Sequence, residues 1–203
     1  FRAFLGLWVE SDHEAETVLM NRASRWLCAA LVAVPGLVAS VPAAGFSLQG
    51  THWDRVAREA SCQLDAYMLY AVALAESGRR TGNGVAPHPW TTNRAGDARY
   101  FDSFEAAAAY VRGLCDRCNV DIGFMQVNLW HHRHRVDDPE DLLNRDTNLR
   151  VGAQILCEAL AEQGDLVRGF GRYHSARPEH KRPYGERVYR YYQRLLQIAE
   201  HGR

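Results

Sequence analysis

The chain has no charge excess, no internal repeat and no low-complexity tract. Its 203 residues carry 24 basic and 24 acidic side chains, and 47% of them are hydrophobic. Without a basic surplus, there is no electrostatic case for nucleic-acid binding over the whole chain. The composition is that of an ordinary globular protein of about one domain, and nothing in it predicts disorder.

A long unbroken apolar run is also missing. The stretch from Trp26 to Val41 is apolar but contains Pro35 and Gly36, whereas a spanning helix needs about 20 continuous apolar residues. Met20, the basic residues after it, this run and the small residues at its end form the pattern of a secretory signal peptide. We therefore expect residues 1–19 to be a non-native upstream extension, residues 20–44 a signal peptide, and residues 45–203 an exported domain. A retained membrane anchor is the alternative; on either reading only this segment would contact a membrane.

Export determines how the cysteines are interpreted. Four remain after the leader: Cys62, Cys115, Cys118 and Cys157. In an oxidising compartment this even number predicts two disulfides, and the sequence leaves all three pairings open. The alternative is a redox motif at Cys115-Asp-Arg-Cys118, but no strand-to-helix context of the thioredoxin kind surrounds it.

The sequence offers no clear metal or cofactor motif. Several imidazoles occur together in Trp130-His-His-Arg-His134. A zinc site would be expected to show a helical i, i+4 pair with a carboxylate, so this cluster is interpreted as a solvated polar stretch. We expect no metal and no cofactor.

The most informative residue is Glu76, which ends the apolar segment Ala66 to Ala75 and precedes Ser77. Asp65 is a good N-cap, so the segment is predicted to be a helix with Glu76 on its buried face. Burial and the negative end of the helix macrodipole both favour the neutral form of such a carboxyl. A protonated glutamic acid at neutral pH is a general acid. The alternative is a glutamate that reaches solvent at the helix end.

Most of the remaining chain has helical patterns, which predict a mainly α single domain. The expected helices are residues 51–62, the Glu76 helix, 103–114 after a cap at Asp102 or Ser103, a short one at Asp138-Pro139, 147–161 capped by Asp146 and closed by Gly164, 165–173 beginning at Asp165, and a last helix after Pro178 with its tyrosines packed inward. Arg79 to Asp102 is rich in glycine, proline and asparagine, which predicts a long irregular loop or short hairpin. A loop of this length in a compact domain is usually functional.

Three further motifs accompany Glu76. Asp121-Ile-Gly-Phe-Met-Gln-Val-Asn128 offers amides that both donate and accept hydrogen bonds, as sugars require. Tyr173-His-Ser175 ends a predicted helix with a phenol that could hold a carboxyl or a sugar hydroxyl. Gly152 lies in mid-helix, where it costs about 1 kcal/mol relative to alanine, and so indicates a close helix contact.

In this order and at these separations, the motifs resemble the soluble lytic transglycosylase (SLT) domain, a goose-type lysozyme-like α fold that cleaves bacterial peptidoglycan. The resemblance covers about Trp53 to Leu196. Ala75-Glu-Ser77 is similar to the family's catalytic Glu-Ser, Gly123-Phe-Met-Gln126 to its Gly-Leu-Met-Gln signature, and Arg172-Tyr173 to its Ala-Tyr-Asn motif. Pro89-Trp-Thr91 and the Met-Gln-Val-Asn run are most similar to the branch serving type IV secretion, conjugation or pilus systems. His174 replaces the asparagine of the commonest motif, a variant that this branch also has.

The resemblance implies a mechanism and a set of roles. Glu76 would be the sole acid and base: it protonates the bond between N-acetylmuramic acid and N-acetylglucosamine, then deprotonates the muramic 6-hydroxyl, which closes a 1,6-anhydro ring. Ser77, Gln126 and Tyr173 would orient Glu76 and the sugar, and Met125 and Asn128 would line the groove. The expected partners are peptidoglycan glycan strands and secretion or conjugation machinery, and the expected location is the periplasm.

Two other functions compete with this one. A lysozyme-type hydrolase would cut the same bond with water, but ordinary glycosidases use two carboxyls and the sequence shows no second one in an obvious site motif. Asp65, Asp97, Asp121 and Asp146 are the rivals, and Asp65 and Asp146 are better explained as helix caps. A non-catalytic wall-binding component of a secretion apparatus is the remaining alternative.

Overall fold

A computed structural model describes residues 46–82 and 84–201 of the chain. The predicted extension at residues 1–19 and the predicted signal peptide at residues 20–44 lie outside the described part. Within that part, seven α-helices and six short strands are present, so the domain is mainly α as the sequence predicts. None of the helices in the described ranges is both long and apolar enough to cross a membrane.

Most of the helices form where the local sequence predicts them, and several begin at a side chain that caps the first turn. The helices are α1 (His52–Glu59), α2 (Ala66–Ser77), α3 (Phe104–Arg112), α4 (Leu129–His132), α5 (Arg145–Gln163), α6 (Leu166–His174) and α7 (Pro178–His201), with 3-10 turns at η1 (Arg133–Arg135) and η2 (Pro139–Leu143). The Asp65, Ser103 and Asp165 side chains each accept a hydrogen bond from a backbone N–H in the first turn of the helix that follows.

One predicted cap is wrong. Asn144, not Asp146, caps α5 by accepting from the Thr147 N–H at 3.1 Å. Asp146 already lies inside the helix, where its carboxylate pairs with the Arg55 guanidinium at 2.6 Å. Asparagine and aspartate are both good N-caps, and Asn144 and Asp146 are only two positions apart. The sequence pattern therefore could not show which of them precedes the first helical turn. The far end of α5 is as predicted, with Gly164 in the left-handed conformation at φ 73°.

The sequence predicts a long irregular loop or a short hairpin between α2 and α3, and the structure has two antiparallel hairpins there. The first pairs β1 (Gly78–Thr81) with β2 (Gly84–Pro87), and the second pairs β3 (Thr91–Arg94) with β4 (Asp97–Tyr100). Ala95 and Gly96 turn the second hairpin with φ of 55° and 90°, the positive values that a tight two-residue turn requires. Strands of four residues carry too little alternation to be predicted from the sequence.

The second hairpin extends into a sheet with the strands of the Asp121–Asn128 motif. The order is β4-β3-β5-β6, where β5 is Asp121–Ile122 and β6 is Val127–Asn128. Asp121 is paired in register with Asn128 across β5 and β6, and with Asn93 across β5 and β3. This small sheet thus places Asp121 and Asn128 side by side at one edge of the helical domain.

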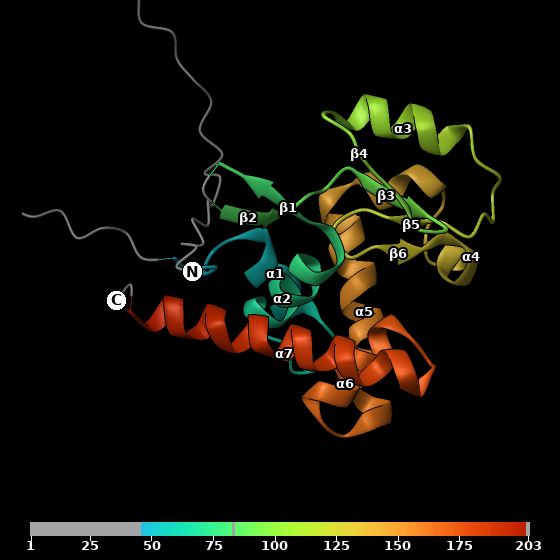
Figure 1. Cartoon of the computed structure of the whole chain (residues 1–203). Helices are drawn as coiled ribbons and strands as arrows, with labels where there is room; N and C mark the ends of the chain where they lie inside the picture. Colours follow the sequence, from blue (N-terminus) through green and yellow to red (C-terminus); the bar gives the residue numbers. More distant parts are fainter. Residues whose placement is uncertain (1–45, 83, 202–203) are drawn as a thin grey trace, which may run out of the picture.

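The helices form the other part of the molecule. α7 packs on both α6 and α2, and α5 packs on α6 and α1. Figure 1 shows α7 as the long red helix that passes below α2 and α5, with the four-stranded sheet and α3 on the opposite side. The contact between α6 and α7 is close, because a Cβ at Gly185 would collide with the backbone oxygen of Val167. The consecutive helices α6 and α7 are therefore packed tightly against each other, and α7 also packs against α2.

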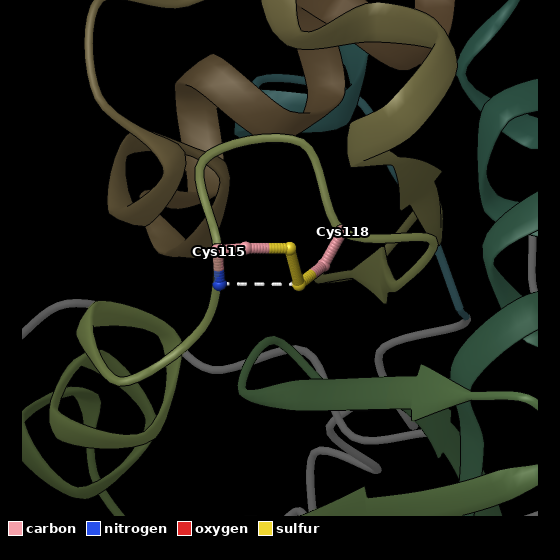
Figure 2. Close-up of a disulfide and its surroundings, with 2 residues drawn as sticks. All are labelled: Cys115 and Cys118. Atoms are coloured by element: carbon pink, nitrogen blue, oxygen red, sulfur yellow. Dashed lines mark hydrogen bonds between the residues drawn. A yellow bond between two sulfur atoms is a disulfide. The ribbon is translucent and has the colours of Figure 1, made fainter.

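Two disulfides form in the described residues, which confirms the predicted number and selects one of the three pairings. Cys62 is bonded to Cys157, and Cys115 to Cys118. The first bond joins the segment after α1 to the middle of α5. The second closes a tight turn before β5, in which the Cys115 N–H donates to Cys118 Sγ at 3.1 Å (Figure 2).

Candidate active site

Glu76 lies in the last turn of α2 and faces a cavity of about 660 Å³ between the helices and the small sheet. Its side chain is only 14% exposed. The α2 helix is apolar on nearly every face, and eight of its residues are buried, so it runs through the core and ends at the cavity. The helix thus delivers a largely buried carboxyl to the wall of a polar cavity.

The carboxyl of Glu76 is held by α7 and α6. The Tyr184 hydroxyl donates to Glu76 Oε1 at 2.5 Å, and His174 Nδ1 lies 3.6 Å from the same oxygen. The His174 and Tyr184 rings are stacked, with centroids 4.3 Å apart and planes 2° from parallel. Burial raises the pKa of Tyr184 well above its ordinary value, and the Glu76 charge raises it further, so the phenol stays a hydrogen-bond donor.

Tyr184 is the residue that the sequence interpretation missed. The tyrosines of the last helix were expected only to pack inward, and the phenol expected near the carboxyl was Tyr173. Instead, the Tyr173 hydroxyl donates to the Met125 backbone oxygen at 2.6 Å. Tyr173 still lines the cavity, and burial raises its pKa well above the ordinary value. The only sequence signal for Tyr184 is the Gly185 beside it, where α7 comes close to α6.

Gln126 and Asn128 both line the cavity. Gln126 adopts a positive φ of 44°, and its side-chain amide donates to the Gly123 backbone oxygen at 2.9 Å. The Asn128 amide donates to Asp121 Oδ1 and Asn119 Oδ1, each at 2.8 Å. These hydrogen bonds are donated by the amide nitrogens and fix both side chains in position, and the Gln126 side-chain oxygen is of the type that accepts from sugar hydroxyls.

Ser77 and Met125 are placed differently from the roles that the resemblance implied. Both are 0% exposed and neither lines the cavity. The Ser77 hydroxyl donates to the Phe124 backbone oxygen at 2.8 Å, which ties α2 to the Gly123–Gln126 turn. The Met125 side chain fills the space left by Gly152, so the close contact expected there is made by a methionine and not by a second helix. Both residues therefore support the cavity wall from behind.

The Gly123–Gln126 turn is held by one buried side chain. Asn148 of α5 is 1% exposed and donates to the backbone oxygens of Ile122 and Leu142, each at 2.8 Å. Its own oxygen accepts from the Met125 N–H at 2.8 Å. Gly123 has φ 79°, and a Cβ there would collide with the Asn148 amide. Three satisfied hydrogen bonds on one buried amide fix the turn that carries Gln126.

A second carboxyl, Asp121, lines the same cavity as Glu76. Burial raises the pKa of Asp121, the Asn128 hydrogen bond lowers it in part, and the charge of Glu76 raises it again. From the sequence, Asp121 was only one of four candidates for a second carboxyl, because two carboxyls 45 positions apart show no common motif. The fold brings them to one cavity, so the sequence argument from a missing second carboxyl no longer separates a transglycosylase from a hydrolase.

No protein-family model, curated protein or solved structure matches this chain. The described residues also contain no group of three or more histidine, cysteine, aspartate or glutamate side chains that could hold a metal ion.

The hydrogen bond from Tyr184 leads to a specific prediction. Replacing Tyr184 with phenylalanine keeps the ring and its stacking on His174 but removes the donor to Glu76. Because a hydrogen bond to a carboxylate contributes about 1.5–3 kcal/mol, we expect kcat of the peptidoglycan cleavage that the resemblance implies to fall by about 10- to 100-fold with little change in KM. The matched control is Tyr191→Phe, which alters an exposed tyrosine of the same helix. Equal activity of the two variants would show that Tyr184 does not position Glu76.

Proposed function

We propose that this protein is a peptidoglycan lytic transglycosylase of SLT type with a lysozyme-like fold. The observation that carries the proposal is the largely buried Glu76, held by the neutral Tyr184 hydroxyl at the wall of a cavity lined by amides. A carboxyl held by a neutral donor can both give and take a proton, as this reaction requires. The family motifs in the sequence and the amide-rich wall favour a sugar polymer as the substrate.

In the proposed reaction, Glu76 gives its proton to the glycosidic oxygen as the bond from muramic C1 breaks. The carboxylate then takes the proton of the muramic 6-hydroxyl, whose oxygen bonds to C1. Both reacting groups belong to one sugar, so positioning can supply much of the rate. Gln126, Asn128 and Tyr173 would hold the sugar in the cavity, while Ser77 and Met125 would keep the wall in place.

The proposed setting is the bacterial periplasm, where the enzyme would open the wall for a secretion, conjugation or pilus apparatus. Two disulfides fit an oxidising compartment. The link to an envelope-spanning apparatus depends on the Pro89-Trp-Thr91 and Met-Gln-Val-Asn motifs of the sequence.

Asp121 favours a second candidate, a lysozyme-type hydrolase of the same bond. Glycosidases that use water generally place two carboxyls about the scissile bond, and Asp121 and Glu76 share one cavity. In such an enzyme, Asp121 would either activate the water or stabilise the charge on the sugar.

Product analysis distinguishes the two reactions. Purified peptidoglycan is digested with the protein, and the released fragments are analysed by mass spectrometry. We expect fragments ending in 1,6-anhydro-N-acetylmuramic acid, which are one water lighter than hydrolysis products. Reducing ends alone would reject the transglycosylase and support the hydrolase. A digest without new ends would reject both and favour a non-catalytic wall-binding component.

A further inference from the structure

The proposed reaction assigns no role to α4, the turn that follows Asn128. This turn contains Trp130, His131 and His132. Asn128 begins this helix, because its side-chain oxygen accepts from the His131 N–H at 3.2 Å. Trp130 is 59% exposed, more than any other large apolar side chain in the described residues. A single exposed aromatic ring is common on protein surfaces and does not by itself indicate a binding site, so the position of Trp130 relative to the cavity has to be considered.

Trp130 lies beside an extension of the cavity. A second hollow of about 360 Å³ is lined by Asn119, Trp130 and His131, and His131 also lines the cavity that contains Glu76. The Asn119 oxygen accepts from the Asn128 amide at 2.8 Å, and Asn128 lines the main cavity. The two hollows are thus adjacent, joined through His131 and the Asn119–Asn128 pair, and Glu76 lines only the first of them.

His132 gives the same wall an unsatisfied polar group. It lines the main cavity, and its Nδ1 is buried without a hydrogen-bond partner among the described residues. The pKa of His132 is lowered to about 4, mainly by burial. Nearby positive charges contribute to this decrease, and the charge of Glu158 opposes it. The ring is therefore neutral near pH 7, with one nitrogen that donates and one that accepts, which suits a sugar hydroxyl.

We propose that the Trp130–His132 turn forms an additional sugar-binding subsite, beyond the sugar that contacts Glu76. The Trp130 indole stacks on the apolar face of a sugar ring in the second hollow, while the imidazole of His131, which lines both hollows, binds a hydroxyl or acetamido group where they meet, and His132 forms part of the adjoining wall of the main cavity. An aromatic ring combined with a few fixed polar groups is a common composition of ligand-binding sites. This inference rests on the proposed function, because it assigns a second part of the groove to the same glycan strand.

The test is the dependence of binding on glycan length. Affinities of β-1,4-linked N-acetylglucosamine oligomers with two to six sugars are measured by calorimetry, with Glu76→Gln as the background to prevent turnover. We expect Trp130→Ala to weaken binding of the longest oligomers by about 10-fold, the scale of an aromatic stacking contact, and to leave the shortest unchanged. Trp130→Phe should restore most of the affinity, and Phe104→Ala, which truncates an exposed aromatic of α3, should have no effect.

Each outcome of this test has a defined meaning. A loss confined to long oligomers supports the subsite. Affinities that Trp130→Ala leaves unchanged at every length, or lowers equally at every length, overturn it; a Trp130 that serves a protein partner would give the unchanged pattern. Failure of the proposed function is seen separately, since the parent chain would then release no new fragments from peptidoglycan, whatever Trp130→Ala does to oligomer binding.

Discussion

Replacing Glu76 with glutamine is expected to reduce the rate of peptidoglycan cleavage by about 10³-fold, within the range that a positioned general acid contributes. Glutamine has nearly the same shape and keeps an oxygen that can accept from the Tyr184 hydroxyl. It cannot deliver a proton to the glycosidic oxygen, so chemistry is lost while the fold and the cavity remain. Release of soluble fragments from purified peptidoglycan measures the change.

The control for this experiment is Glu105→Gln, the same substitution at an exposed position in the first turn of α3, away from the cavity. It is expected to have parent activity. Thermal unfolding of both variants checks that any loss is chemical. If Glu76→Gln cleared peptidoglycan as fast as the parent, Glu76 would not be the acid, and Asp121 would be the next carboxyl to test. If the parent itself were inactive, the non-catalytic alternative would be favoured.

Removing the Cys62–Cys157 disulfide is expected to have the largest effect on stability. The bond joins residues 95 positions apart, and closing a loop of that length restricts the unfolded chain strongly. The double variant Cys62→Ala/Cys157→Ala should lower the free energy of unfolding by about 4–5 kcal/mol. Urea denaturation measured by circular dichroism gives this value from the midpoint and slope.

The matched control is Cys115→Ala/Cys118→Ala, which removes a bond across a separation of only 3 residues. The same relation gives a cost of about 2 kcal/mol or less. Equal losses in the two double variants would contradict the explanation from loop closure. The control also tests the redox alternative, because cleavage of peptidoglycan that survives loss of Cys115 and Cys118 excludes a catalytic role for that pair.

Most of the helices could be predicted from local sequence signals. Asp65, Ser103 and Asp165 cap helices where the sequence predicts them, and Gly164 ends α5. Capping depends on hydrogen bonds within about one turn, so the neighbouring residues carry the information. The number of disulfides could also be predicted from the cysteine count. Their pairing could not, because it depends on how α5 packs against the segment after α1.

The composition of the cavity could not be predicted in this way, because it depends on how distant segments pack. Tyr184 and Glu76 are 108 positions apart, and their hydrogen bond exists because α7 packs against both α6 and α2. Asp121 reaches the cavity because β5 pairs with β3 and β6, strands too short to be predicted. Ser77 and Met125 turn away from it because the packing of α2 and α5 surrounds them. Local hydrogen bonds set where a helix starts, but contacts between distant segments set which side chains share one cavity.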